Sequence, residues 1–355
     1  MIKTEDERDG SIFEMSSGRL FSVTSGCIIG PLLIAMKSIP IILSCDDRYA
    51  VLLGTCLCSL FENKKGDYSI DIYIIDSGLS DRSKERLHVL EKRYGFSIQY
   101  VTPNEEYFGK VPIHKLAGHY RLPIQNYHRL ALGQILPLTC RKAINLDVDT
   151  VVRGDIAEFY NLDLQGKTMG VVADPDPDYK MNHLRALAQA VGVTPPPTST
   201  FYFNSGIMLV DVERWRNLAV QDQALDIITA HPNKLSYHDQ DALNIVLWGD
   251  CLELPPRYNL ITDIADKLGV PDPLIVHYSG GGKPWYFFSA MPFHADYLRY
   301  VKMTPWKGER YRKFMDVYFA RKYGIYPIVW RIWVAFKKIR LFVRTGIMYL
   351  RGGVR

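Results

Sequence analysis

Apolar and polar positions along the chain fall into blocks that predict strands alternating with helices. Residues 39–45 form a continuous apolar run, as expected for a strand buried on both faces, and the run ends at Asp46. Residues 49–61 then carry apolar side chains at helical spacing. Further runs of strand length occur at residues 70–75, 97–101, 143–152, 169–173, 202–210 and 274–277. This alternation predicts an α/β fold with a mainly parallel central sheet.

The connections between these runs are also predicted from local patterns. Ser80 can cap a helix that ends before Gly95. Further helices are expected at residues 126–136, 211–230 and 239–247. Residues 174–197 are rich in proline and polar side chains, so we expect a loop-rich excursion over the site there.

Chemically active side chains gather where the predicted strands end, which is where open parallel sheets bind ligands. They are Asp46, Asp76, Asp147, Asp149, Asp174 and His277. If residues 143–152 form one strand, Asp147 and Asp149 point the same way, with Cβ atoms about 6.5 Å apart. Carboxylates that close repel each other, and a divalent cation would keep both ionised.

Composition and charge narrow the class of protein. The chain has 355 residues, of which 47% are hydrophobic and 23% are charged, typical of an ordinary globular protein. Its six cysteines lie mostly in apolar segments without zinc spacing, so we expect reduced thiols in a cytoplasmic protein. Residues 317–355 hold nine basic side chains and no acidic one, which leaves the remainder net acidic. That distribution argues against a nucleic-acid partner.

The two ends of the chain differ from its centre. Residues 1–36 lack the pattern of a signal peptide, and we expect a poorly ordered extension. Residues 37–290 are the predicted catalytic domain, and residues 291–355 a helical C-terminal region. From residue 332 onward, apolar side chains fall on one arc and basic ones outside it. This predicts peripheral attachment to the anionic inner face of the cytoplasmic membrane.

Six short motifs follow one another in a characteristic order. They are CDDRYA at residues 45–50, YHRL at 127–130, LDVD at 146–149, FNSG at 203–206, DQDALN at 239–244 and HYSGGGKPW at 277–285. Together they resemble glycosyltransferase family 8, whose retaining enzymes use nucleotide sugars on a GT-A fold. The likeness covers residues 38–288 and is nearest to the bacterial enzymes of lipopolysaccharide and lipooligosaccharide synthesis.

The resemblance implies a fold, a reaction and a cofactor. The fold would be GT-A, a Rossmann-like α/β arrangement. The reaction would transfer galactose or glucose from a UDP-hexose donor to a hydroxyl of a surface glycan, with lipopolysaccharide or another lipid-linked glycan as acceptor. Asp147, Asp149 and His277 would bind Mn²⁺, with Mg²⁺ as the alternative. The cation would stabilise charge on the leaving diphosphate.

Further residues receive roles from the resemblance alone. The donor-binding set comprises Asp46, Asp47, Tyr49, Arg129, Asp147, Val148, Asp174, Asn204, Gly280 and Lys283. Arg48 stands where the family often has asparagine. Asp239 and Gln240 would face the reacting carbon. Because Gln240 is an uncharged amide and a poor nucleophile, we expect same-face substitution rather than a covalent intermediate.

Several alternatives stay open at this level. Asp239 could simply cap its helix, and His277 could be a core histidine beside a glycine-rich loop. A glycogenin-like self-glycosylating protein, or a sugar-nucleotide-binding protein, would carry the same donor motifs. Asp147 and Asp149 also fit the nucleophile loop of haloacid-dehalogenase-type phosphatases, although that loop usually follows the first strand.

Overall fold

The computed structural model describes residues 38–102, 108, 124–196, 201–280, 283–285 and 291–307, together with six short strands elsewhere. The chain divides into two compact units, one of residues 39–66 and 70–355, the other of residues 1–38 with 67–69. In the smaller unit, β1 (Glu14–Ser16) pairs antiparallel with β2 (Arg19–Phe21), and β3 (Val23–Thr24) with β4 (Cys27–Ile28). The larger unit carries the candidate site.

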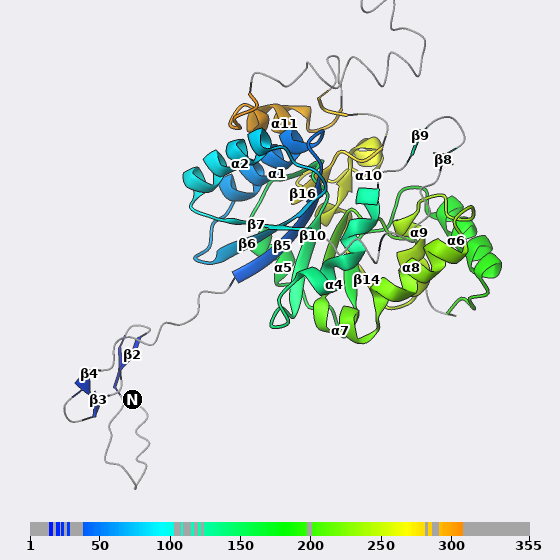
Figure 1. The fold of residues 1–355 in the computed structure, drawn as a ribbon, viewed down its shortest axis with the longest axis horizontal. Coiled ribbons are helices and arrows are strands. Elements are labelled where there is room, and N and C mark those ends of the chain that lie inside the picture. Colours follow the sequence, from blue (N-terminus) through cyan, green and yellow to red (C-terminus); the bar gives the residue numbers. More distant parts are fainter. Residues whose placement is uncertain are drawn as a thin grey trace, which may run out of the picture. The chain divides into compact units, whose positions relative to one another are not determined.

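A seven-stranded sheet with the order β14-β12-β13-β10-β5-β6-β7 forms the centre of the larger unit (Figure 1). β10 is parallel to β5, β6 to β7, and β12 to β14, whereas β13 is antiparallel to both of its neighbours. The mainly parallel sheet is therefore confirmed. Its strands are β5 (Ser38–Cys45), β6 (Ser69–Asp76), β7 (Ile98–Val101), β10 (Lys142–Leu146), β12 (Met169–Val171), β13 (Ile207–Asp211) and β14 (Cys251–Glu253).

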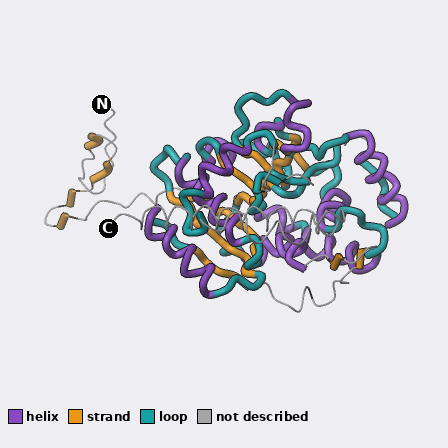
Figure 2. Tube along the Cα trace, turned by 90° about the horizontal axis from the view of Figure 1, so that it is seen from above, coloured by secondary structure: helices purple, strands orange, loops and turns teal. Residues whose placement is uncertain are grey.

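Helices cover the sheet, and Figure 2 shows strands lying between them. Apolar faces make this packing possible: in α1, for example, nearly every residue from Ala50 to Leu60 is buried. The helices are α1 (Ala50–Glu62), α2 (Asp81–Tyr94), α4 (Leu132–Ile135), α5 (Ile156–Tyr160), α6 (Pro177–Val191), α7 (Val212–Asn217), α8 (Val220–Ala230), α9 (Asp239–Val246), α10 (Ala265–Leu268) and α11 (His294–Val301). Three 3₁₀ helices are described, η1 (Ile124–Ala131), η2 (Pro256–Tyr258) and η3 (Thr262–Ile264). A further short pair joins β8 (Lys115–Leu116) to β9 (Tyr120–Arg121).

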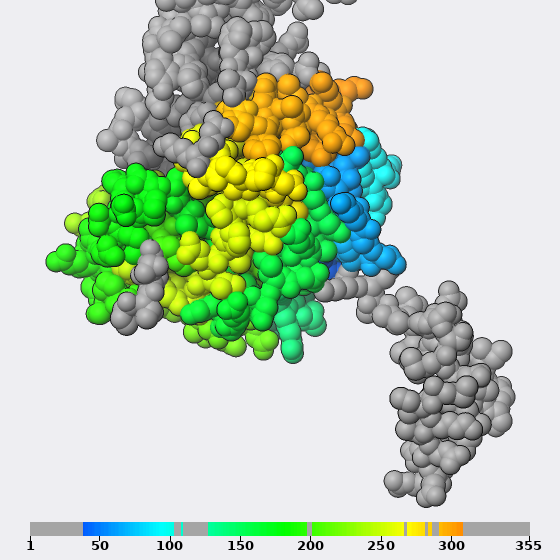
Figure 3. All heavy atoms as spheres, turned by 180° about the vertical axis from the view of Figure 1, so that it is seen from behind, coloured from blue at the N-terminus to red at the C-terminus, as the bar shows by residue number. Residues whose placement is uncertain are grey.

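A second, three-stranded sheet carries part of the site. In it, β16 (Ile275–His277) lies between β11 (Thr150–Val152) and β15 (Leu260–Ile261). The antiparallel register places Thr150 opposite His277. In the view of Figure 3, the segment that contains β15 and β16 (yellow) reaches the surface between the region that contains α6 (green) and the N-terminal region of the unit (blue).

The expectation of one strand over residues 143–152 is wrong. The chain leaves the large sheet after Leu146, turns at residues 147–149, and enters the small sheet at Thr150. The turn is held by Asp147, whose N–H donates to Gly206 O (2.8 Å) and whose carbonyl accepts from Thr150 Oγ1 (2.8 Å). Asp147 and Asp149 still face one site, but a turn brings them there rather than the pleat of a strand.

The prediction of a loop-rich excursion over residues 174–197 is also wrong, because most of this segment is the helix α6. Asp176 caps this helix by accepting from Tyr179 N–H, and Pro177 occupies its first turn, where no N–H is needed. Gly192 ends it in a left-handed conformation. The expected strand over residues 202–210 is shorter and begins at Ile207, and the helix expected over residues 126–136 is mostly the 3₁₀ helix η1.

The predicted ends of the chain fall largely outside the described residues. The basic tail, residues 317–355, lies wholly outside, and so does most of the N-terminal extension, residues 1–36. The domain boundaries at residues 36 and 290 stay predictions. Within the described part of the chain, no helix combines the length and apolarity needed to span a membrane.

Candidate active site

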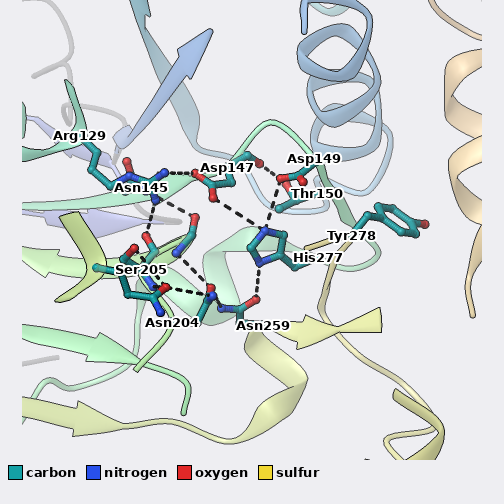
Figure 4. A network of polar contacts seen from close by, with 12 residues as sticks. Arg129, Asn145, Asp147, Asp149, Thr150, Asn204, Ser205, Asn259, His277 and Tyr278 are labelled. Carbon is teal, nitrogen blue, oxygen red and sulfur yellow. Dashed lines mark hydrogen bonds and ion pairs between the residues drawn. The ribbon is translucent and has the colours of Figure 1, made fainter. Parts of the chain in front are cut away.

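Asp147, Asp149 and His277 form a cluster at the junction of the two sheets (Figure 4). One ligand atom from each lies within 4.8 Å of the others. Nε2 of His277 is 3.8 Å from Oδ2 of Asp147 and 3.4 Å from Oδ1 of Asp149. Two carboxylate oxygens and one imidazole nitrogen converging in this way suit a divalent cation such as Mn²⁺ or Zn²⁺.

Gly206 makes room for this cluster. A Cβ at this position would collide with Cε1 of His277 and would lie 2.7 Å from Oδ2 of Asp147. The absence of a side chain at residue 206 therefore lets both groups approach the same point.

Arg129, on η1, connects the cluster to the start of α9. Its guanidinium pairs with Asp147 (2.9 Å) and Asp239 (3.1 Å), and donates to the carbonyl of Ser205 (2.7 Å). Its side chain is 14% exposed, so these interactions operate in a partly desolvated setting, where they are stronger than at the surface. The arginine supplies fixed positive charge beside the cluster.

The two aspartates of the cluster have opposite electrostatic environments. Removal from solvent raises the pKa of Asp147, although Arg129 opposes the effect. Burial also acts to raise the pKa of Asp149, but Lys283, whose Nζ is 2.7 Å away, and His277 outweigh it, so that this pKa lies well below its usual range. Asp149 is thus held as a carboxylate by its neighbours.

A second polar group lies next to the cluster and consists of buried amides around one carboxylate. Oδ2 of Asp174 accepts from Nδ2 of Asn204 (3.1 Å) and from Nε2 of Gln240 (3.1 Å). Oε1 of Gln240 in turn accepts the backbone N–H of Ser205 (3.1 Å). On its other side, Asp174 pairs with Lys180 (3.1 Å). These hydrogen bonds therefore fix the orientations of the Asn204 and Gln240 side-chain amides.

Asp239 is the first residue of α9 and is 6% exposed. Burial raises its pKa to about 6; Arg129 opposes this and Asp147 adds to it. The preceding residue, His238, has φ 53° and ψ −114°, a strained backbone conformation for a residue with a side chain. The cap position of α9 is His238, which makes no side-chain capping hydrogen bond, so Asp239 is not the helix cap, and its carboxylate pairs with Arg129 instead.

The raised pKa of Asp239 predicts a measurable dependence of stability on pH. The carboxyl ionises near its ordinary 3.8 when unfolded and near 6 when folded, so between these values the folded state holds an extra proton. Raising the pH through this window therefore lowers the free energy of unfolding, by on the order of 3 kcal/mol relative to Asp239→Asn. Urea denaturation of both proteins from pH 4 to pH 7 measures this, and a difference that does not change with pH would contradict it.

Several of the residues described above line a cleft of about 300 Å³. It is lined by Arg129, Asp147, Asn204, Ser205, Gly206, Ser236, Tyr237, His238, Asp239, Gln240, His277 and Ser279. Its size suits a small ligand, and most of the residues that line it have polar or charged side chains.

The other predicted site residues lie around this centre. Val148 is buried in the turn between the aspartates, and Tyr49, just before α1, is partly exposed. Asp46 pairs with Arg48 (2.6 Å), and Asp47 accepts from Ser80 and Ser83 at the start of α2. Lys283 reaches Asp149, as described. Gly280 has φ +91°, and a Cβ there would collide with the carboxylate of Asp263.

Two buried polar residues were not predicted as part of the site. Lys180 lies on α6, where a loop was expected, and Asn259 is an isolated asparagine whose Oδ1 is 3.0 Å from Nδ1 of His277. Neither stands in a recognisable motif. Only the folded arrangement shows that they support the cleft.

The fold is shared with solved sugar-transferring enzymes. The galactosyltransferase LgtC, in a structure with donor and acceptor sugar analogues, superposes with a TM-score of 0.64 at 21% identity, covering 76% of this chain and all of LgtC. The bifunctional glycosyltransferase WbbM gives a TM-score of 0.63 at 21% identity, with 79% of this chain and 52% of WbbM covered. The architecture is thus the GT-A fold predicted from the sequence.

The sequence profile of Glycosyl transferase family 8 matches residues 40–288, and the chain belongs to this family. It is 29% identical to general stress protein A of Bacillus subtilis over 283 residues, 75% of this chain and 94% of that protein. It is 28% identical to lipopolysaccharide 1,2-glucosyltransferase of Escherichia coli over 275 residues, 74% and 78% of the two chains. The protein is accordingly an enzyme, a hexosyltransferase of the retaining type. The phosphatase alternative is therefore discarded.

Proposed function

We propose that the protein transfers galactose or glucose from a UDP-hexose to a hydroxyl of a surface glycan, with retention of configuration and dependence on Mn²⁺. The observation that carries this proposal is the cluster of Asp147, Asp149 and His277, of which Asp147 and His277 line the cleft. Membership of family 8 supplies the class of reaction. The family resemblance supplies the UDP-linked donor.

The residues present fit a divalent cation. Asp147 and Asp149 offer carboxylate oxygens, His277 offers Nε2, and Gly206 leaves the space between them open. Mg²⁺ prefers oxygen ligands alone, whereas Mn²⁺ accepts a mixed set, which favours manganese. A cation at this place would supply positive charge against the departing nucleoside diphosphate.

The protein's own residues would bind and orient the donor. Arg129, held by Asp147 and Asp239, adds fixed positive charge on the cleft wall. Asn204 and Gln240 present amide groups whose planes are set by Asp174 and Ser205, so they would contact sugar hydroxyls without reorganising. Asp46, Asp47, Tyr49, Val148, Gly280 and Lys283 keep their proposed donor-binding roles from the family resemblance.

Same-face substitution remains our proposal for the chemical step. Oε1 of Gln240 belongs to an uncharged amide, which is a poor nucleophile. It also already accepts a hydrogen bond from the Ser205 N–H, which makes it less available for attack. Asp239 is a carboxylate in the same wall of the cleft, and it is paired with Arg129. A glycosyl adduct trapped on Asp239 would contradict the proposal.

We propose lipopolysaccharide or a related lipid-linked surface glycan as the acceptor. Two relatives support this choice by their own activities, lipopolysaccharide 1,2-glucosyltransferase of Escherichia coli and lipopolysaccharide 1,3-galactosyltransferase of Salmonella typhimurium, the latter 22% identical over 251 residues. The basic tail, residues 317–355, would attach the enzyme to the inner face of the cytoplasmic membrane. Sedimentation with anionic vesicles, with and without residues 324–355, measures that attachment.

The test of the proposed function is donor hydrolysis followed by NMR. We expect slow, Mn²⁺-dependent consumption of either UDP-glucose or UDP-galactose, with the α-anomer released first and no reaction in EDTA. Asp149→Asn, which removes one charge from the cluster, should lose activity about 100-fold or more. If no UDP-sugar is bound or consumed with or without metal, the proposal is wrong. An increase in intact protein mass would instead indicate self-glycosylation.

A further inference from the structure

Asn259 contacts the histidine of the cluster from a segment with no predicted role. It lies between η2 and β15, is 1% exposed, and donates its backbone N–H to Pro256 O (3.1 Å). β15 then pairs in parallel with β16, with Ile261 opposite His277. The backbone therefore places the Asn259 side chain firmly beside the imidazole.

The orientation of the Asn259 amide follows from its other neighbours. Oδ1 of Asn204 accepts the backbone N–H of Gly206 (3.1 Å), a group that can only donate. The same oxygen lies 2.9 Å from Asn259 and can only accept, so the NH₂ group of Asn259 must face it. This leaves Oδ1 of Asn259 facing Nδ1 of His277 at 3.0 Å (Figure 4).

The identity of the histidine donor is then determined. An amide oxygen carries no hydrogen, so Nδ1 of His277 must donate. The hydrogen on Nδ1 leaves Nε2, which faces Asp147 and Asp149, as the nitrogen available to a cation. We propose that Asn259 is a positioning residue that keeps the hydrogen of His277 on Nδ1 and directs Nε2 toward the metal.

This proposal rests on the metal site proposed above and makes its ligand geometry more specific. Partners of this kind commonly fix metal-binding histidines, and their loss costs about 10–100-fold in metal affinity. Asn204 also donates to Asp174 and Gln240, so one chain of hydrogen bonds joins the amides of the cleft to the imidazole. Asn259 thus acts on the metal through His277 and does not itself face the cleft.

The first measurement is Mn²⁺ affinity, by electron paramagnetic resonance of free Mn²⁺, for the full chain without nucleotide. Asn259→Leu keeps the approximate volume but removes the acceptor, and we expect its affinity to fall about 10–100-fold. Asn259→Asp also loses the donor to Asn204 but keeps an oxygen facing Nδ1, so its affinity should stay closer to that of the wild type and the difference between the two variants isolates the acceptor. Thermal melts of the metal-free proteins identify a variant that has not folded.

The second measurement needs neither metal nor a folded variant of Asn259. In wild-type protein labelled with ¹⁵N-histidine, NMR should show a proton bonded to Nδ1 of His277, with His277→Gln used to identify the signal. An absent Nδ1 proton overturns the proposal, as does unchanged affinity in Asn259→Leu or equal losses in both variants. If the wild type binds no Mn²⁺, the metal part of the proposed function fails, while the NMR result still decides the role of Asn259.

Discussion

Gly206→Ala is expected to lower the rate of sugar transfer about 100-fold or more while the protein still folds. The added Cβ would collide with Cε1 of His277 and lie 2.7 Å from Oδ2 of Asp147, so both groups must move apart. Gly206 does not have the positive φ that penalises alanine, so the obstacle is steric. A displacement of about 1 Å in the groups that position a reaction can cost about 100-fold in rate.

Gly154→Ala provides a matched control away from the cleft. Its added Cβ would lie 2.7 Å from Cδ1 of Leu274, the far end of a flexible side chain. The crowding is similar, but no polar group of the site is touched, so activity should be nearly unchanged. Steady-state rates with the preferred UDP-sugar, at saturating Mn²⁺, compare the two variants. Gly206→Ala activity equal to that of Gly154→Ala would show that the cluster tolerates the displacement.

Lys180→Met is expected to lower the free energy of unfolding by about 3–5 kcal/mol. The side chains of Lys180 and Asp174 are 9% and 10% exposed, and Nζ of Lys180 also lies 3.1 Å from the centre of the Tyr237 ring. Methionine fills a similar volume but leaves the Asp174 carboxylate buried without its cation. Removal of one partner of a buried ion pair costs far more than removal of both.

The double variant Lys180→Met/Asp174→Asn therefore tests the cause of this loss. It removes both charges, and we expect it to recover a substantial part of the stability in urea denaturation. Lys142→Met is the control for a half-buried lysine outside the cleft, since Nζ of Lys142 donates to Leu162 O and lies over the Tyr160 ring. A loss in Lys180→Met no larger than that in Lys142→Met would rule out a special role for the Lys180–Asp174 pair.

The order of strands and helices could be predicted because most elements carry a strong local signal. The strand at residues 39–45 is apolar except for Ser44, and the helix α2 has recognisable capping residues at both ends, Ser80 and Gly95. The turn at residues 147–149 could not be predicted, since apolar and polar side chains alternate over residues 144–149 as they do in one strand. It is fixed by Gly206, a residue distant in sequence that accepts the N–H of Asp147.

The candidate site was predictable to the extent that its residues stand in motifs. Asp147 and Asp149 come after β10, His277 is the last residue of β16, and the structure brings the three side chains together as that position predicts. Lys180 was missed because the prolines around it indicated a loop, although Pro177 suits the first turn of a helix. Asn259 was missed because its partners, Asn204 and His277, are distant in sequence and only tertiary packing joins them.

The small sheet has a consequence for the timing of folding. Asp149 leads directly into β11, whose partner strand β16 carries His277 and is among the last strands described in the chain. During synthesis on the ribosome, the central strands therefore emerge long before the third member of the cluster. Until β16 has emerged and paired with β11, the cluster of Asp147, Asp149 and His277 is incomplete, so the proposed metal site cannot form.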